Sequence, residues 1–167
     1  MKDLPACAED GPTFRENACQ KALHYSQFTS GLVFADDSGL CVDALGGAPG
    51  VYSARFAGQG ATDEANNAKL LRALNEARRA TGQGNRAAHY VCVIALAGRK
   101  QILTTVEGRA DGLILEAPRG RGGFGYDPLF FFPPLGKTFA ELTPEAKFEL
   151  SHRGHAFRKL LEYLGAA

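Results

Sequence analysis

Residues 87–97 are apolar almost throughout, and this run constrains the fold more than any other feature of the chain. A strand with one face in water alternates apolar and polar residues, whereas a continuous apolar run is typical of a strand covered on both faces. The stretch 90–97 is also too short to cross a bilayer. The run therefore predicts a strand covered on both faces and not a membrane span.

Helices are expected in four places, each opened by a hydroxyl side chain that can cap the first turn. These caps are Thr13, Thr62, Thr143 and Ser151. Apolar residues then repeat at helical spacing, most clearly in the last helix. Strands are expected at 32–35, 87–97, 101–110 and 129–132, with a long structured loop at 40–60. This order of elements indicates a mixed α/β domain.

The composition excludes several classes of partner. The 167 residues, 45% hydrophobic and 22% charged, suit a single globular domain over 1–167. A net charge of +1 gives no field that would draw the chain to nucleic acid or to an anionic membrane. The first residues lack the apolar stretch of a secretion signal, and the four cysteines lack metal-ligand spacing. We expect a cytoplasmic protein with ordinary thiols and neither a membrane nor a nucleic-acid partner.

An acidic cluster is expected where the strand 32–35 ends in a turn at 36–39. Its members are Glu9, Glu16, Asp36 and Asp37. Carboxylate oxygens are the ligands that Mg²⁺ prefers, usually one or two from the protein, with water and substrate phosphates completing the shell. The alternative is a plain polar turn, with Glu16 capping the helix after Thr13.

A second cluster is the glycine-rich loop at 120–128, where four of the six residues 120–125 are glycine. Glycines let the backbone approach a flat or anionic ligand closely. Phe124 and Tyr126 lie in this stretch, and an aromatic ring there can stack on a nucleobase. The alternative is a tight connection whose aromatic rings pack into the core.

A third cluster, Lys147 with Ser151-His152-Arg153, lies at the expected junction of two helices. Lys147 and Arg153 offer only hydrogen-bond donors, and a helix start adds backbone donors, which suits phosphate or a carbonyl edge. An ordinary solvated helix start is the alternative. Together the three clusters describe metal ligands, a slot for a base, and donors for anionic or carbonyl groups, which is the set that a nucleotide requires.

The motifs around these clusters resemble the inosine triphosphatase family, in order from about Glu9 to the C-terminus. The first half contains Glu9-x-Gly11-x-Thr13-Phe14-x-Glu16-Asn17-Ala18-x-x-Lys21-Ala22, Ala35-Asp36-Asp37-Ser38-Gly39-Leu40 and Leu45-Gly46-Gly47-Ala48-Pro49-Gly50-Val51-Tyr52-Ser53-Ala54-Arg55. The second half contains Gly122-Gly123-Phe124-Gly125-Tyr126-Asp127-Pro128, Gly136-Lys137-Thr138, Glu141-Leu142 and Ser151-His152-Arg153-Gly154.

The resemblance implies Mg²⁺-dependent hydrolysis of inosine, deoxyinosine or xanthosine triphosphate between the α and β phosphates. It also implies a homodimer and an elongated mixed β-sheet with flanking helices in two lobes, with the active site in the cleft. By position, Asp37 is similar to the general base and metal-linked carboxylate, and Glu9 to the other Mg²⁺ ligand. Asp36 and Glu16 would support that site. The substrate contacts implied are Ser38, Phe124, Gly125, Tyr126, Asp127, Lys147, His152 and Arg153.

One family feature has no counterpart in this sequence. The family begins with a strand and a turn of the form Thr/Ser-Gly-Asn-x-x-Lys, which grips the triphosphate, so we expect a chain truncated at its N-terminus relative to the family. An active pyrophosphatase is one hypothesis, and a catalytically weak or silent nucleotide binder is the second. A third hypothesis, a septum-associated pyrophosphatase with pyrimidine preference, conflicts with the Ser-His-Arg and Gly-Phe-Gly-Tyr-Asp motifs.

Overall fold

The structure is a computed structural model and describes residues 4–165. Its sheet has five strands in the order β1-β2-β3-β4-β5, and the pairings of β3 with β4 and of β4 with β5 are antiparallel. The strands are β1 (Val33–Val42), β2 (Ala87–Gly98), β3 (Gln101–Ile114), β4 (Phe130–Phe132) and β5 (Lys137–Thr138). The helices are α1 (Phe14–Ser26), α2 (Asp63–Thr81), α3 (Pro144–Leu150) and α4 (His152–Tyr163). The predicted α/β class, a sheet with flanking helices, is confirmed.

The predicted helix starts are largely confirmed. The hydroxyls of Thr13, Thr62 and Thr143 accept hydrogen bonds from the backbone N–H three residues later, at 3.2, 3.2 and 3.3 Å. Ser151 directly precedes α4 and also ends α3. The start of each helix could be predicted because a cap needs only neighbours in the sequence.

One strand prediction is wrong. The strand expected to end at residue 35 continues through Asp36, Asp37 and Ser38 to Val42, so the acids lie within β1 and not in a turn. The loop expected from residue 40 correspondingly begins later and contains two 3₁₀ helices, Asp43–Leu45 and Gly50–Arg55. The polar run continues the strand because its side chains find partners on neighbouring elements, as described below.

The chain divides into two compact units. The first unit comprises the described residues up to Ser38, Cys92–Arg109, and the described residues from His152 onward. The second unit comprises Gly39–Val91 and Ala110–Ser151. No helix in residues 4–165 has the length and apolar character needed to cross a membrane.

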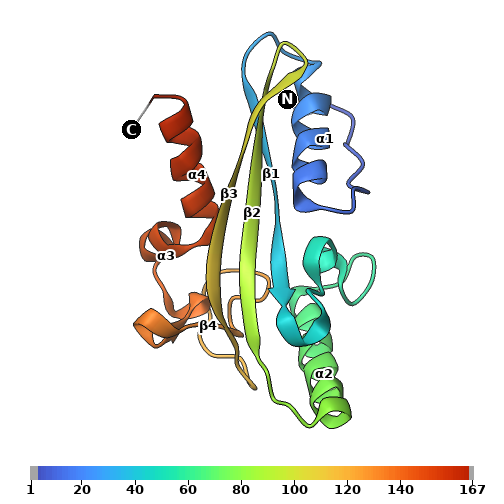
Figure 1. Cartoon of the computed structure of the whole chain (residues 1–167), viewed down its shortest axis with the longest axis vertical. Coiled ribbons are helices and arrows are strands. Elements are labelled where there is room, and N and C mark those ends of the chain that lie inside the picture. The colour runs from blue at the N-terminus through green and yellow to red at the C-terminus, as the bar shows by residue number, and fades with distance from the viewer. Residues whose placement is uncertain (1–3, 166–167) are drawn as a thin grey trace. The chain divides into compact units, whose positions relative to one another are not determined.

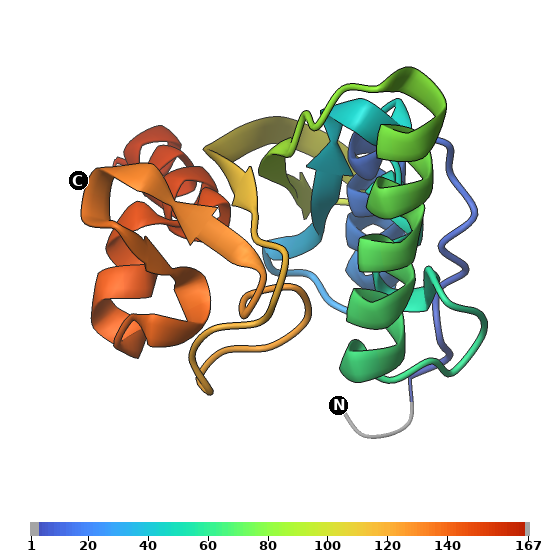
Figure 2. The ribbon, with the colours of Figure 1, turned by 90° about the horizontal axis from the view of Figure 1, so that it is seen from below.

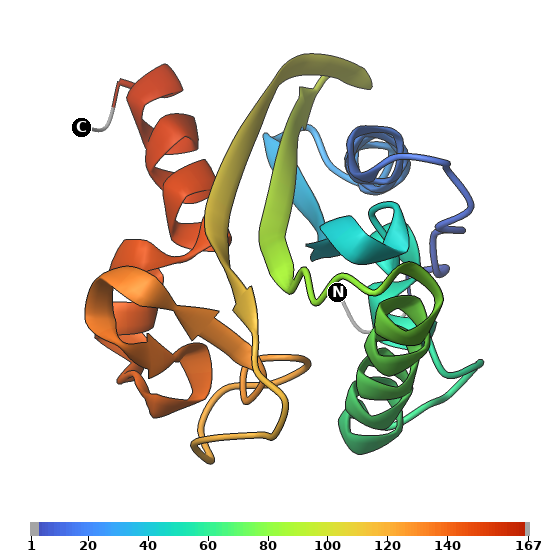
Figure 3. The ribbon, with the colours of Figure 1, turned by 60° about the horizontal axis from the view of Figure 1, so that its bottom comes forward.

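In the first unit, α1 and α4 lie on opposite sides of the strands (Figures 1 and 3). Alternate residues of β2, Cys92, Ile94 and Leu96, form a buried cluster with Ala156 and Leu160 of α4. The intervening β2 residues Val93, Ala95 and Ala97 are also buried. The prediction of a strand covered on both faces is therefore confirmed.

The second unit has its own core, which gathers buried residues from its strand segments and from α2. Its centre is an aromatic group in which the Phe130 ring lies 4.7 Å from Tyr90 and 4.8 Å from Phe139, centroid to centroid. The glycine-rich loop belongs to the connection between β3 and β4, drawn in gold in Figure 2, where it passes between β4 and α2. Tyr126 of the loop and Leu129, which directly follows it, are part of this core.

Candidate functional site

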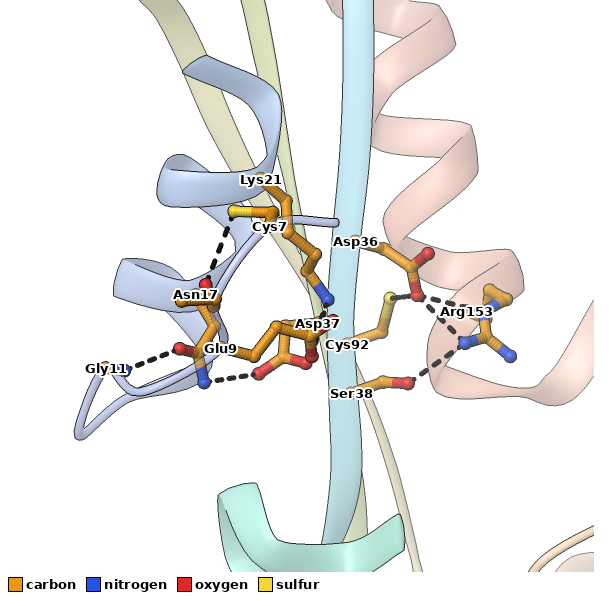
Figure 4. A network of polar contacts seen from close by, with 11 residues as sticks. Cys7, Glu9, Gly11, Asn17, Lys21, Asp36, Asp37, Ser38, Cys92 and Arg153 are labelled. Atoms are coloured by element: carbon orange, nitrogen blue, oxygen red, sulfur yellow. Dashed lines mark hydrogen bonds and ion pairs between the residues drawn. The ribbon is translucent and has the colours of Figure 1, made fainter. Parts of the chain in front are cut away.

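Two carboxylates converge on one ammonium group in the first unit. Lys21 Nζ lies 3.2 Å from Glu9 Oε2 and 3.2 Å from Asp37 Oδ1. Asn17 Nδ2 donates a second hydrogen bond to Asp37, to Oδ2 at 3.1 Å. Figure 4 shows Glu9, Asn17 and Lys21 gathered with Asp37 on one side of β1.

The geometry of this group follows from α1. Asn17 and Lys21 are four residues apart, so both side chains lie on the helix face that meets β1. The Asn17 amide is oriented by the segment before the helix, because Gly11 N–H donates to its Oδ1 at 2.8 Å. A Cβ at Gly11 would lie 2.8 Å from that oxygen, so a side chain here would displace the Asn17 amide. The same contact holds the segment that carries Glu9 against α1.

The electrostatics of this group are set by burial and by the pairing. Burial raises the pKa of Asp37, and the hydrogen bond from Asn17 and the charge of Lys21 offset the rise only in part. Burial lowers the pKa of Lys21, but the carboxylates of Asp37 and Glu9 outweigh it, so the net pKa is raised. A carboxylate whose pKa is raised is better able to accept a proton than an ordinary surface aspartate.

Asp36 lies on the opposite face of β1 and has different partners. Arg153 of α4 donates to Asp36 Oδ2 from Nη2 at 2.8 Å and from Nε at 3.2 Å, and to Ser38 Oγ at 3.0 Å (Figure 4). Cys92 Sγ lies 3.7 Å from the same carboxylate oxygen, and burial raises the thiol's pKa to about 12, so the thiol is the donor. Asp36 and Ser38 together hold the guanidinium of Arg153.

The expectation of a single cluster of four acids is therefore wrong. Alternation along β1 separates Asp36 from Asp37. Glu16 lies exposed in the first turn of α1, where its backbone N–H donates to Thr13. Sequence reasoning also missed two residues that the structure brings to Asp37, namely Asn17 and Lys21. Their spacing of four on an expected helix was a usable signal, because it places both on one helix face.

In the second unit, Asp127 organises the glycine-rich loop. Its Oδ2 accepts a hydrogen bond from Phe124 N–H at 2.8 Å and pairs with Lys147 Nζ. The Lys147 ammonium also lies 4.3 Å from the centroid of the Phe124 ring, a cation–π contact. Burial raises the pKa of Asp127, and Lys147 opposes the rise. The Phe124 side chain is 61% exposed, so its ring is available to a ligand.

Two residues of this loop have structural reasons for their identity. Gly123 has φ +74°, and a Cβ there would lie 2.0 Å from Asp127 Oδ2, so a side chain would displace the carboxylate. Tyr126 is 3% exposed, belongs to the core of the second unit, and donates its hydroxyl to Ser53 O at 2.8 Å. The loop therefore directs Phe124 outward and Tyr126 into the core of the second unit.

A cavity of about 410 Å³ lies beside the loop, entirely within the second unit. It is lined by loop residues that include Phe124 and Gly125, by Leu129, and by the first turns of α2, which contribute Asp63 and Asn67.

The basic cluster expected at the helix junction is divided between the two units. Lys147 of α3 pairs with Asp127 in the second unit, whereas Arg153 of α4 pairs with Asp36 in the first. His152 is 6% exposed at the start of α4. A Cβ at Gly108 would lie 2.0 Å from the His152 carbonyl oxygen, so β3 approaches the start of α4 closely.

The donor set near Asp37 has the chemistry of a divalent-cation site. Among residues 4–165, no group of three or more histidine, cysteine or acidic side chains is arranged to hold a metal. Glu9 and Asp37 nonetheless place two carboxylate oxygens around one point, occupied by the Lys21 ammonium. Two carboxylates are the number that Mg²⁺ usually takes from a protein when substrate phosphates supply further ligands.

Comparison with known proteins adds relatives that match along nearly the whole chain. The sequence model of the Ham1 family matches residues 1–163. The dITP/XTP pyrophosphatase of Desulforamulus reducens is 54% identical over 156 residues, which cover 93% of this chain and 76% of the relative. That of Geobacter sulfurreducens is 51% identical over 163 residues, covering 98% and 80%. The solved HAM1 protein of Coxiella burnetii superposes with a TM-score of 0.91 at 43% identity, covering 98% of this chain and 82% of that one.

Proposed function

The chain belongs to the Ham1 family, and from that membership we propose that it hydrolyses deaminated purine nucleoside triphosphates, ITP, dITP and XTP, to the monophosphate and pyrophosphate. The observation that carries the proposal is the 54% identity to a dITP/XTP pyrophosphatase over 93% of the chain. The resemblance to the inosine triphosphatase family inferred from the motifs is confirmed. The reaction would remove non-standard purines from the nucleotide pool.

Mg²⁺ is the metal we propose, and Glu9 and Asp37 are the residues that would hold it. Both offer hard oxygen ligands, and the Lys21 ammonium already marks a point where positive charge is stabilised between them. When bound, the cation would offset negative charge on the triphosphate. Lys21 would then be free to turn toward a phosphate oxygen.

Asp37 is the residue we propose as general base. Water attacks phosphorus, the bond between the α and β phosphates breaks, and pyrophosphate leaves. The proton lost by the water passes to the Asp37 carboxylate. Its raised pKa favours this acceptance, and Asn17 keeps the carboxylate oriented.

The purine ring would be recognised by stacking and by its keto group. The exposed Phe124 ring, with the Lys147 ammonium beside it, supplies a flat surface for a base. Arg153 and His152 can donate hydrogen bonds to a 6-keto oxygen, whereas adenine has a 6-amino group there and would leave those donors unpaired. Discrimination on this basis can reach about a thousandfold or more. Further substrate contacts that we propose are Ser38 beside Arg153, Gly125, which has no side chain to keep a ligand away, and its neighbours Tyr126 and Asp127.

A nucleotide panel tests the proposal. We expect Mg²⁺-dependent release of pyrophosphate from dITP, ITP and XTP, much faster than from ATP or GTP, and its loss in Asp37→Asn. Background release from every purine triphosphate, together with inosine-nucleotide binding by calorimetry, would favour the silent binder. Faster turnover of UTP and dUTP would favour the pyrimidine-preferring relative.

Several expectations from the sequence stay predictions. They are the homodimer, the absence of a nucleic-acid partner, the cytoplasmic location, and the organisation of residues 1–167 as one pyrophosphatase domain. Sedimentation of the chain with and without dITP would test the dimer directly.

A further inference from the structure

We infer that Asp63 and Asn67 of α2 are positioning residues for the Phe124 ring, an inference that rests on the proposed stacking of Phe124 on the purine. Asp63 Oδ2 accepts a hydrogen bond from Gly125 N–H at 2.6 Å. Asn67 Nδ2 donates one to Gly125 O at 2.9 Å. Asp63 and Asn67 are four residues apart, so they lie on the same face of α2. That face therefore binds both the N–H and the C=O of Gly125, the residue after Phe124.

The backbone at Gly125 determines where Phe124 points. Gly125 has φ +61°, a left-handed conformation, and open space surrounds the position of a Cβ there. Glycine is therefore required by the backbone conformation and not by a close neighbour. A glycine in a loop is free to leave such a conformation, so the two contacts from α2 supply the restraint that the residue itself lacks.

The restraint is part of a continuous attachment of the loop. Phe124 N–H donates to Asp127, Gly125 is held at both ends by α2, and the Tyr126 hydroxyl donates to Ser53. Only the Phe124 ring in this stretch is largely exposed. Holding a loop in its binding conformation removes the ordering cost that a ligand would otherwise have to meet. Release of Gly125 should therefore weaken nucleotide binding.

Asn67 is poorly explained as a residue kept for stability alone. Its Oδ1 is buried, and within residues 4–165 no group donates a hydrogen bond to it. Buried acceptors are normally paired, and an unpaired one opposes folding. The Asn67 side chain thus donates to Gly125 O although its own Oδ1 is left buried without a hydrogen bond. Asn67 and Phe124 also line the same cavity.

A double-mutant cycle tests the inference. Asn67→Ala and Asp63→Ala are each made in the natural sequence and in a Phe124→Ala background, and kcat and KM are measured with dITP. We expect each α2 variant to raise KM by about tenfold, with kcat changed by less than about threefold, since a hydrogen bond of this kind is worth about a factor of ten. In the Phe124→Ala background the same changes should raise KM no further.

Matched variants separate the hydrogen bonds from other effects. Asp63→Asn removes the charge from the first turn of α2 but keeps an acceptor oxygen for Gly125 N–H, so KM should stay within about twofold of the natural chain. Glu76→Gln changes an exposed acid further along α2 and should have no effect. Because the sequence contains no tryptophan, Phe124→Trp adds a single fluorescent reporter at the ring. Inosine monophosphate should quench it, with a half-saturation concentration that rises about tenfold when Asn67→Ala is added.

An equal rise in KM with and without the Phe124 ring would overturn the inference, because the effect would not pass through that ring. The inference would also be overturned if Asn67→Ala left the half-saturation concentration of inosine monophosphate for the Phe124→Trp reporter unchanged. This measurement does not require the chain to turn over a substrate. If Phe124→Ala alone leaves KM for dITP unchanged, the proposed stacking fails, and the positioning role fails with it. The single Phe124 variant thus distinguishes failure of the proposed function from failure of this inference.

Discussion

Asp36 and Asp37 are consecutive residues of β1, yet their carboxylates lie on opposite faces of the strand. Asp37 is paired with Lys21 of α1, and Asp36 with Arg153 of α4. Successive side chains of a strand point to opposite faces, so one strand carries two acid–base pairs with separate surroundings. The two aspartates should therefore contribute to the reaction in different ways.

Replacement of each aspartate by asparagine should separate these contributions. Asp37→Asn removes the proposed proton acceptor, so kcat for dITP should fall by about 10²- to 10⁴-fold. Asp36→Asn weakens the ion pair that orients Arg153, the proposed donor to the keto group. It should therefore mainly raise KM for dITP and reduce the ratio of kcat/KM for dITP to kcat/KM for ATP. Steady-state kinetics on both nucleotides measure the difference. An equal loss of kcat in the two variants would contradict separate roles.

The raised pKa of Asp37 predicts how stability depends on pH. Because burial disfavours its ionised form, the folded chain loses stability as pH rises through the window from the unfolded pKa, about 3.9, to the raised folded value. Asparagine has nearly the same shape as aspartate but does not ionise, so the Asp37→Asn variant has no such loss of stability with rising pH. In metal-free buffer, the Tm of Asp37→Asn relative to that of the natural chain should therefore fall as the pH is lowered through that window.

Calorimetry across this pH range checks the sign. Asp10→Asn is the matched control, because it neutralises an exposed carboxyl outside the buried group. If the Tm of Asp37→Asn relative to that of the natural chain instead rises as the pH is lowered, the pairing with Lys21 outweighs burial and the direction of the pKa shift is contradicted.

Features that depend on local sequence were predictable, and those that depend on distant partners were not. The caps at Thr13, Thr62 and Thr143 need only the next turn of their own helix. The continuation of β1 through Asp36 and Asp37 depends on partners in α1 and α4, and an Asp-Asp-Ser-Gly run alone has the composition of a turn.

The same distinction applies within the candidate site. The motif that contains Lys21 was recognised, but nothing local shows that its ammonium reaches Asp37, sixteen residues away in the sequence. The glycine-rich loop was recognised as well, but the outward direction of Phe124 and the inward direction of Tyr126 come from the packing of the second unit.

Lys21 should compete with a divalent cation for the same carboxylates. Lys21→Met leaves Glu9 and Asp37 close together without a counter-charge, so the metal-free chain should lose about 1–3 kcal/mol of stability, or about 2–4 °C in Tm for each kcal/mol. Addition of Mg²⁺ should recover much of this loss, because the cation takes over the neutralisation. Thermal melts with and without Mg²⁺ provide the measurement.

Lys159→Met is the control for the Lys21 variant. The Lys159 ammonium belongs to the same unit but donates to a backbone carbonyl, Glu107 O, at 2.7 Å. Its removal should not change the response to Mg²⁺. If Mg²⁺ raises the Tm of the natural chain and of both variants by the same amount, the cation binds elsewhere and Glu9 and Asp37 are not its ligands.

Tyr126 and Phe124 should respond oppositely to substitution, although only Gly125 separates them. Tyr126→Phe removes the hydroxyl that donates to Ser53 O and leaves that carbonyl without this partner, which should cost about 1–3 kcal/mol and lower the Tm. KM for dITP should stay within about twofold, because the remaining ring still fills its place in the core. Phe124→Leu should do the reverse, raising KM while the Tm holds, since the ring is 61% exposed. Should Tyr126→Phe instead raise KM at an unchanged Tm, the hydroxyl must reach the nucleotide, and the buried contact with Ser53 is not its role.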